Sequence, residues 1–148
     1  MTYVDPETRA RAAAYGHPFA SEEVIAAGHD LAARVCRELR RAGLPAHVPG
    51  PQEPSRPGAA VEVELQGDHA GGLYVRWGAP ELGLAGLRAA AERQDPAAPE
   101  WKRYGEVVVL MQTALIGILR PAGFSVVPAE EVDDLAEGDV YVHADPPS

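Results

Sequence analysis

Apolar residues recur every three or four positions between residues 21 and 42, and this spacing predicts an amphipathic helix. Ser21 precedes the run in the place of an N-cap, because a serine hydroxyl accepts hydrogen bonds from the free amides of the first turn. Arg40 and Arg41 lie in the expected last turn, and Gly43 follows as the left-handed residue that commonly ends a helix. We therefore expect a helix over 21–42 with one buried stripe.

A longer helix is predicted over 100–119, where none of the thirteen residues from Val107 to Leu119 is charged. The run is too short to cross a bilayer, which takes about 20 residues. A helix that is apolar on several sides is covered by its own fold or by a second copy of the chain. We therefore expect the chain to form a homodimer through 100–119. Weaker helical patterns predict two further helices at 80–94 and 6–14.

The period of the pattern changes to two in the middle of the chain, which predicts an antiparallel β-hairpin. Residues 61–65 and 73–77 alternate apolar and polar side chains, and the glycine-rich stretch 67–72 provides the turn between them. Two more strands are expected at 124–128 and 139–143. Since strand side chains alternate between faces, one face of the sheet should be apolar and covered by helices.

The register of the hairpin follows from the same alternation. Apolar residues of the two strands must share a face, so Leu65 is expected opposite Leu73, or the register is shifted by two residues. Either choice places Glu62 or Glu64 opposite Arg76. We expect such a cross-strand ion pair to contribute about 0.2–1 kcal/mol to stability.

Together these elements predict an α+β fold: a mainly antiparallel sheet of four to five strands with two or three helices packed on one face. The length of 148 residues fits one domain, which we place at 19–144. Residues 1–18 are expected to form a weakly ordered arm and residues 145–148 a tail. Four prolines between positions 49 and 58 exclude a helix or central strand there, so 49–59 is expected to be an exposed loop.

Charge restricts the classes of partner. The chain carries 13 basic and 22 acidic residues, a net charge of −9. Nucleic-acid binding requires clustered Lys and Arg against the phosphates, so we expect neither a nucleic acid nor a membrane as partner. Residues 121–148 hold seven carboxylates and no Lys or Arg. A patch of one sign attracts partners of the opposite sign, so we expect a protein partner with a basic surface.

Cysteine usage and the N-terminus bear on location. Cys36 is the single cysteine, which excludes an intramolecular disulfide, and its place inside a helix predicts an inert buried thiol. The first residues lack the basic and apolar segments of a signal peptide, so we expect a cytoplasmic protein. Arg outnumbers Lys by 12 to one, and this bias, together with many Ala, Gly and Pro residues, is typical of a high-GC bacterial genome.

Two sets of residues are candidates for binding. The first is the acidic segment, which either docks a basic partner or is a solvated connector. Its members are Glu130, Glu131, Asp133, Asp134 and Glu137. The second is the polar face of the predicted sheet, whose members are Glu62, Glu64, Tyr74, Arg76, Tyr141 and His143. That face is a plain solvated surface, a binding surface rich in Tyr and Arg, or a catalytic surface with His143 as the base and Glu62 or Glu64 orienting it.

Motifs for the common reaction classes are absent from the sequence. There is no phosphate-binding glycine loop or nucleophile elbow, and the five histidines lack metal-ligand spacing. We therefore expect no catalytic residue, metal ion or cofactor. The sequence favours a non-catalytic protein-binding domain of the immunity, antitoxin or accessory type. The alternative is a small-molecule-binding protein or small enzyme with a pocket between the polar sheet face and neighbouring elements. The two differ in whether that face is open or is covered by the N-terminal arm and the proline-rich loop.

Overall fold

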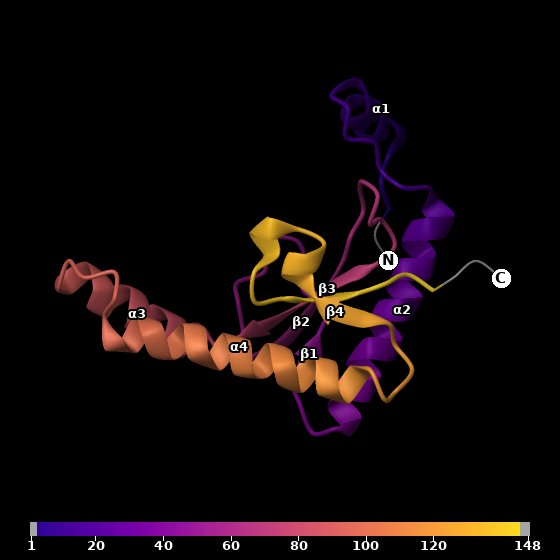
Figure 1. The fold of residues 1–148 in the computed structure, drawn as a ribbon. Helices are drawn as coiled ribbons and strands as arrows, with labels where there is room; N and C mark the ends of the chain where they lie inside the picture. The colour runs from indigo at the N-terminus through magenta and orange to yellow at the C-terminus, as the bar shows by residue number, and fades with distance from the viewer. Residues whose placement is uncertain (1–2, 146–148) are drawn as a thin grey trace.

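The computed structural model describes residues 3–145, and these residues have the predicted α+β fold. In chain order the elements are α1 (Pro6–Ala14), α2 (Glu22–Arg41), β1 (Ala46–His47), β2 (Gly58–Val63), β3 (Leu73–Gly78), α3 (Pro80–Glu92), α4 (Pro99–Leu119), β4 (Val126–Pro128) and β5 (Val140–Val142). Two short 3-10 turns, η1 (Ala129–Glu131) and η2 (Asp134–Ala136), separate β4 from β5. The strands form one sheet in the order β1-β2-β3-β5-β4 (Figure 1).

The core lies between the sheet and two helices, α2 and α4. Leu31, Val35 and Leu39 of α2 and Leu115 and Leu119 of α4 are almost completely buried there. The strands add the alternate residues Val61, Leu73, Val75, Val126, Val140 and Val142. Burial of each large apolar side chain stabilises the fold by roughly 1.5–3 kcal/mol. The predicted helix-covered face of the sheet is therefore confirmed.

The cap residues explain why α2 begins and ends where the sequence predicts. The Ser21 hydroxyl accepts a hydrogen bond from the Val24 amide at 3.2 Å. At the other end Gly43 has a φ of +94°, in the region that glycine adopts without strain.

The sheet is mainly antiparallel, as predicted, but it is mixed because it contains one parallel pair of strands. β1 runs parallel to β2 through the pairs Ala46↔Ala59 and His47↔Ala60, whereas the other neighbouring strands are antiparallel. A strand of two residues is too short to show alternation, so the sequence pattern contains no sign of it. The Arg40 guanidinium holds it in place with hydrogen bonds of 2.7 and 3.0 Å to the Ala46 carbonyl.

The hairpin register differs from both predicted choices, although the faces are right. Val63 lies opposite Leu73 and Arg76 lies opposite Ala60, so the expected glutamate–arginine pair is not formed. The reason is that Leu65 leaves the hairpin: its carbonyl accepts a hydrogen bond from the Ala20 amide at 2.8 Å. β2 therefore begins and ends earlier in the chain than the alternation indicates.

α3 and α4 form a helical arm, so that of the four helices in the described chain only α2 and α4 pack on the sheet. α3 packs along the N-terminal part of α4. The pair extends away from the sheet to the left in Figure 1, whereas α2 lies to the right. Only the C-terminal part of α4 reaches the core, through Leu115 and Leu119. Val109 and Leu110 are 57% and 66% exposed. Within residues 3–145 the fold therefore leaves part of this apolar helix uncovered.

The N-terminal arm contains the helix expected at 6–14, which is α1. Arg9 of α1 donates to the Ala20 carbonyl and to Glu22, and so ties the helix to the start of α2. Of the tail predicted at 145–148, all but Asp145 lies outside the described residues. No helix in the described part of the chain is both long enough and apolar enough to cross a bilayer.

Candidate functional site

The two surfaces predicted from the sequence meet in the structure. Arg76 of the sheet face lies 3.4 Å from a carboxylate oxygen of Asp139, at the end of the acidic segment. Burial raises the pKa of Tyr74, and the carboxylates of Glu64, Asp133 and Asp139 raise it further. The acidic segment therefore borders the polar sheet face, and we call the turn from residue 131 to residue 137 the acidic turn.

Glu130 anchors the acidic turn and is not free to bind a partner. Both of its carboxylate oxygens accept from the buried Gln112 amide of α4 at 3.0 Å, and one also accepts from the Gly138 amide at 3.1 Å. Gln112 in addition donates to the Asp139 carbonyl at 2.7 Å. Burial opposes ionisation of Glu130, but the hydrogen bonds from its own amide, Gln112 and Gly138 lower its pKa overall. We therefore assign Glu130 a structural role.

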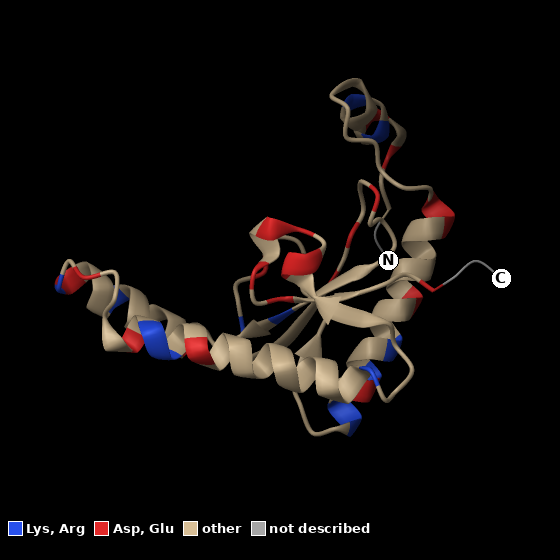
Figure 2. Cartoon of the chain, viewed as in Figure 1, with Lys and Arg blue, Asp and Glu red and all other residues tan. Residues whose placement is uncertain are grey.

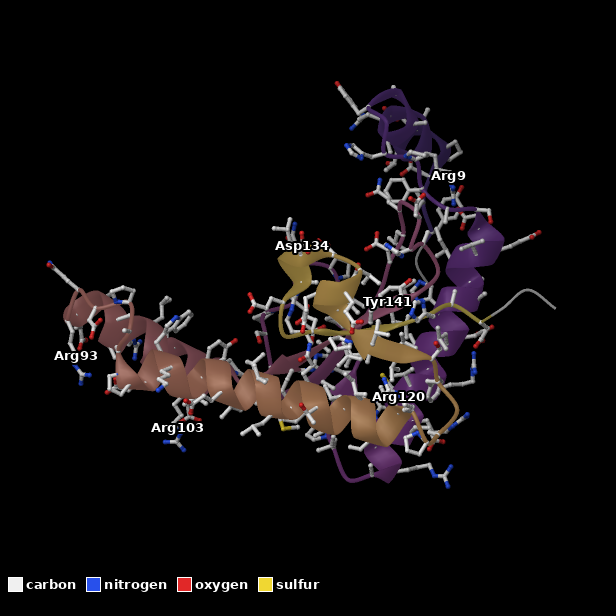
Figure 3. The ribbon with its side chains drawn as sticks, in the orientation of Figure 1. Arg9, Arg93, Arg103, Arg120, Asp134 and Tyr141 are labelled. Atoms are coloured by element: carbon white, nitrogen blue, oxygen red, sulfur yellow. The ribbon has the colours of Figure 1, made fainter. Side chains whose placement is uncertain are left out.

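The outer side of the acidic turn carries the free charges. None of the carboxylates of Glu131, Asp133, Asp134 and Glu137 forms a salt bridge with a residue in the range 3–145. Acidic colour gathers on η1 and η2 in Figure 2, and Asp134 lies at the outer edge of the turn in Figure 3. Asp133 is positioned by accepting a hydrogen bond from the Leu135 amide at 2.9 Å.

Leu135 stands among these carboxylates, and the sequence analysis did not single it out. Its side chain is 95% exposed, at the tip of η2. A polar turn of this length has no periodicity that would show which way one leucine points, so the sequence contained no usable signal. The acidic turn therefore presents one large apolar side chain surrounded by unpaired negative charge.

Tyr141 does not lie on an open surface, which corrects one predicted site residue. It is only 2% exposed, and its hydroxyl donates to the His69 carbonyl at 2.9 Å beneath the turn between β2 and β3. The rings of His69, Tyr74 and His143 each meet it edge to face. Burial raises the pKa of Tyr141 to about 12, with smaller effects from Tyr74 and Glu64. Figure 3 labels Tyr141 near the middle of the molecule.

The catalytic interpretation of the sheet face has no support in the geometry. His143 is exposed, and no hydrogen bond joins it to Glu62 or Glu64 among the described residues. Glu62 is exposed opposite Tyr74, and Glu64 accepts from the Gln66 amide at 3.1 Å. A general base needs an orienting partner within hydrogen-bond reach, and these carboxylates do not provide one.

The proline-rich loop covers the part of the polar face next to β1. Together they enclose a cavity of about 170 Å³, whose lining includes His47, Arg56, Glu62 and Arg76. His47 is only 8% exposed and has no side-chain hydrogen bond to a described residue. Burial lowers the pKa of His47, and Arg56 and Arg40 lower it further. His47 is not among the residues predicted from the sequence, because it lies on β1, a strand too short for the sequence pattern to show.

A second hollow lies where the arm joins the sheet. Trp77, Trp101 and Tyr104 line a cavity of about 420 Å³, with Glu137 and Asp139 on its rim. The rings of Trp101 and Tyr104 lie 5.4 Å apart, centre to centre. This aromatic hollow borders the acidic turn, so an apolar group bound there would lie beside the free carboxylates.

Between residues 3 and 145, no group of three or more His, Cys, Asp or Glu side chains is placed to hold a metal ion. Burial raises the pKa of the Cys36 thiol, which makes it a poor nucleophile. A scan against protein-family models finds no match for the chain, and comparisons with curated proteins and with solved structures find none either.

Proposed function

We propose that this chain is a non-catalytic protein-binding domain that docks a basic partner through its acidic turn. The observation that supports this is Leu135, a fully exposed leucine held among four carboxylates that have no ion-pair partner in the described chain. Leucine is among the residue types most often buried, and Leu135 is the most exposed large apolar residue in the described chain. The fold does not bury Leu135, so the free energy that burial of this side chain would release is gained only when a partner covers it.

The arrangement matches the general anatomy of a protein interface. Binding energy concentrates in a few central apolar or aromatic side chains, while the charged rim sets orientation and association rate. Leu135 would be the central anchor, and Glu131, Asp134 and Glu137 the rim. The aromatic hollow beside the turn adds apolar area next to the anchor. The partner that fits this surface has an apolar pocket bordered by Lys and Arg.

The hydrogen bonds around Glu130 support the same proposal. A turn that is tied to α4 by Gln112 and to β5 by Asp139 is ordered before binding, so little conformational entropy is lost on docking. We place this role among immunity-, antitoxin- or accessory-type proteins of a bacterial cytoplasm. The buried, free Cys36 fits a reducing compartment.

We also propose that two copies of the chain associate through α4. The support is the uncovered apolar surface of Val109 and Leu110, within a stretch that carries no charge. The acidic turn of one copy would repel that of another, whereas this part of α4 would not.

The test of the docking surface begins with recovery of the partner by affinity capture from the native lysate, followed by binding kinetics. We expect Leu135→Ser to weaken binding about tenfold or more, because a central anchor contributes more than about 1.4 kcal/mol. The matched control is Leu87→Ser, which removes an exposed leucine of the arm. Equal affinities for the wild type and Leu135→Ser would contradict the proposal.

A charge-reversal variant tests the rim separately. Glu131, Asp134 and Glu137 are changed to Lys, and Glu130 and Asp133 are retained because their carboxylates accept hydrogen bonds within the turn. We expect association to slow strongly and the melting temperature to stay nearly constant, since exposed charges contribute little to stability. Binding of the wild type should also weaken as salt rises through about 0.15 M, where the Debye length is about 8 Å. An unchanged association rate would identify the turn as a solvated connector.

The alternative function, small-molecule binding, is favoured by one observation: the cavity beneath the proline-rich loop is lined by the largely buried His47 together with Arg56 and Arg76. Its test is native mass spectrometry of the purified chain. A bound small molecule in the wild type that is lost in Ala60→Leu, which fills the cavity, would support this alternative. If the Ala60→Leu variant still binds the molecule, the molecule binds outside this cavity.

A further inference from the structure

The edge of the sheet at β2 is open over a short stretch. Pairing with β1 ends at His47↔Ala60, and the next contact along this edge is the hydrogen bond from the Ala20 amide to the Leu65 carbonyl. Val63 lies between these two points. An uncovered strand edge is a template for pairing with another chain.

The direction of the backbone groups follows from the alternation of hydrogen bonds along a strand. The Glu64 amide donates to the Gly72 carbonyl at 2.9 Å, so Glu64 faces β3. The Ala59 amide donates to the Pro45 carbonyl at 2.9 Å, so Ala59 faces the opposite edge. Val63 lies four positions after Ala59 along β2, so its backbone groups point in the same direction as those of Ala59. Both the N–H and the C=O of Val63 therefore point to the open edge. No group in the described chain bonds to either of them.

A hollow of about 370 Å³ lies at this edge. Residues 48–53 of the proline-rich loop form one wall, His29 of α2 lies on another, and Glu62, Val63 and Leu65 complete the lining. The Nε2 atom of His29 is buried and has no hydrogen-bond partner in the described chain. The unpaired backbone groups of Val63 thus border a hollow that His29 also lines, and a buried polar atom such as His29 Nε2 normally has a hydrogen-bond partner.

The charge of the residues that line this hollow indicates which kind of ligand would bind there. Glu53 and Glu62 are the acidic residues of the lining, which includes no Lys or Arg. Glu53 is paired with Arg56 outside the lining at 3.5 Å, so Glu62 is the carboxylate available to a basic ligand. Side chains of paired residues share a face, so a residue opposite Val63 points to the apolar side, and its neighbours point to the side of Glu62 and Glu64.

We propose that this edge binds a short extended segment of a partner protein, which pairs with Val63 as an additional strand and alternates basic and apolar residues. The open stretch from Val61 to Leu65 spans about 13 Å at roughly 3.3 Å per residue, room for about four residues. Main-chain hydrogen bonds provide affinity in this mode of recognition, and alternate side chains provide selectivity. The site is separate from the acidic turn and does not depend on its proposed role.

The test is an NMR titration of the full chain, labelled with ¹⁵N, with the capped peptide acetyl-Lys-Val-Lys-Val-Lys-amide at millimolar concentration. We expect chemical-shift changes at the amides of Val63 and Leu65 and at the His29 ring, and slower exchange of the Val63 amide. The matched control peptide is N-methylated at both valines, which removes the donors that would reach Val63. We expect it to bind at least tenfold more weakly.

A second pair of measurements separates this site from general attraction to an acidic protein. We expect Glu62→Gln to weaken peptide binding severalfold, and Leu135→Ser to leave it unchanged. Equal binding of the N-methylated peptide, shifts confined to the acidic turn, or no shift at Val63 would each overturn the proposal. Failure of the docking proposal at the acidic turn would leave these results unaffected.

Discussion

At the scale of single residues, Gly72 and Tyr141 meet where the turn between β2 and β3 crosses the sheet. A Cβ placed on Gly72 would overlap the Tyr141 hydroxyl and lie 2.9 Å from the Val142 carbonyl oxygen. The hydroxyl in turn donates to the His69 carbonyl, on the far side of the same turn. The absence of a side chain at position 72 is therefore what allows the turn to close over the tyrosine.

This contact gives a prediction for stability, measured by urea unfolding. We expect Gly72→Ala to lower the free energy of unfolding by about 1–3 kcal/mol, as overpacking typically does. Tyr141→Phe should cost about 1 kcal/mol, the net value of one hydrogen bond. The double variant should cost somewhat less than the sum of the two, because phenylalanine removes the nearest atom that the added methyl group would meet but keeps the ring Cζ, 2.5 Å from it. Strict additivity would show that the turn relaxes away from the ring.

Asp139 gives a prediction about pH. Burial raises the pKa of its carboxyl, Arg76 counteracts that rise, and the carboxylates of Glu62 and Glu130 add to it. A raised pKa in the folded state means that Asp139 stabilises the fold below its unfolded pKa of about 3.9 and that this contribution is lost as pH rises through the folded value. We therefore expect Asp139→Asn to raise the melting temperature at pH 7 and to have no such effect near pH 3. A lower melting temperature at pH 7 would show that the pair with Arg76 dominates.

The residue scale also shows where sequence reasoning succeeds and fails. Alternation correctly assigned Val61, Leu73 and Val75 to the buried face, because the two-residue period is a property of the strand alone. It could not find the partner of Arg76, since that depends on a register set by Leu65 and on an acidic segment 63 positions further along the chain. Burial of Tyr141 was missed for the same reason: the turn that covers it is distant in sequence.

At the scale of elements, α2 and α4 end with the same capping arrangement. The Gly43 and Gly123 amides bond back to Arg40 and Arg120, and each arginine donates to the carbonyl six residues ahead, of Ala46 and Val126. The first glycine cap was predictable, because cap chemistry is local. The link from arginine to carbonyl was not, since it exists only when an edge strand follows the helix.

α4 gives the prediction at this scale. Val109 and Leu110 are adjacent exposed residues within the uncharged stretch of α4, and self-association would cover them. We expect the wild type to be a dimer by light scattering at micromolar concentration and Leu110→Glu to be a monomer with unchanged helix content. Leu87→Glu, on the exposed side of α3, is the control and should remain dimeric. Ile116 is unsuitable for this purpose because it packs against the core. A monomeric wild type would contradict the prediction.

At the scale of the whole molecule, stability should be distributed unevenly between the sheet and the arm. α3 buries only Gly86 and Ala89, and it has no side-chain cap at its N-terminus. Its two interior glycines each cost about 1 kcal/mol relative to alanine, yet Gly86 cannot be replaced, because a Cβ there would lie 2.9 Å from the Trp101 Cα. The arm thus packs closely but buries little apolar area, which is the property of segments that open locally.

Hydrogen exchange of the monomeric Leu110→Glu variant tests this distribution without interference from a second copy. We expect the amides of α3 to exchange with a much lower opening free energy than those of β3 and the middle of α2, which are protected by the core around Val75 and Val35. In the dimer that we propose for the wild type, the protection of α4 near Leu110 should rise, because association covers that surface, while β3 should change little. Equal protection of α3 and β3 in the monomer would mean that arm and sheet unfold as one cooperative unit, and that the joint at Trp77 transmits the stability of the core along the whole arm.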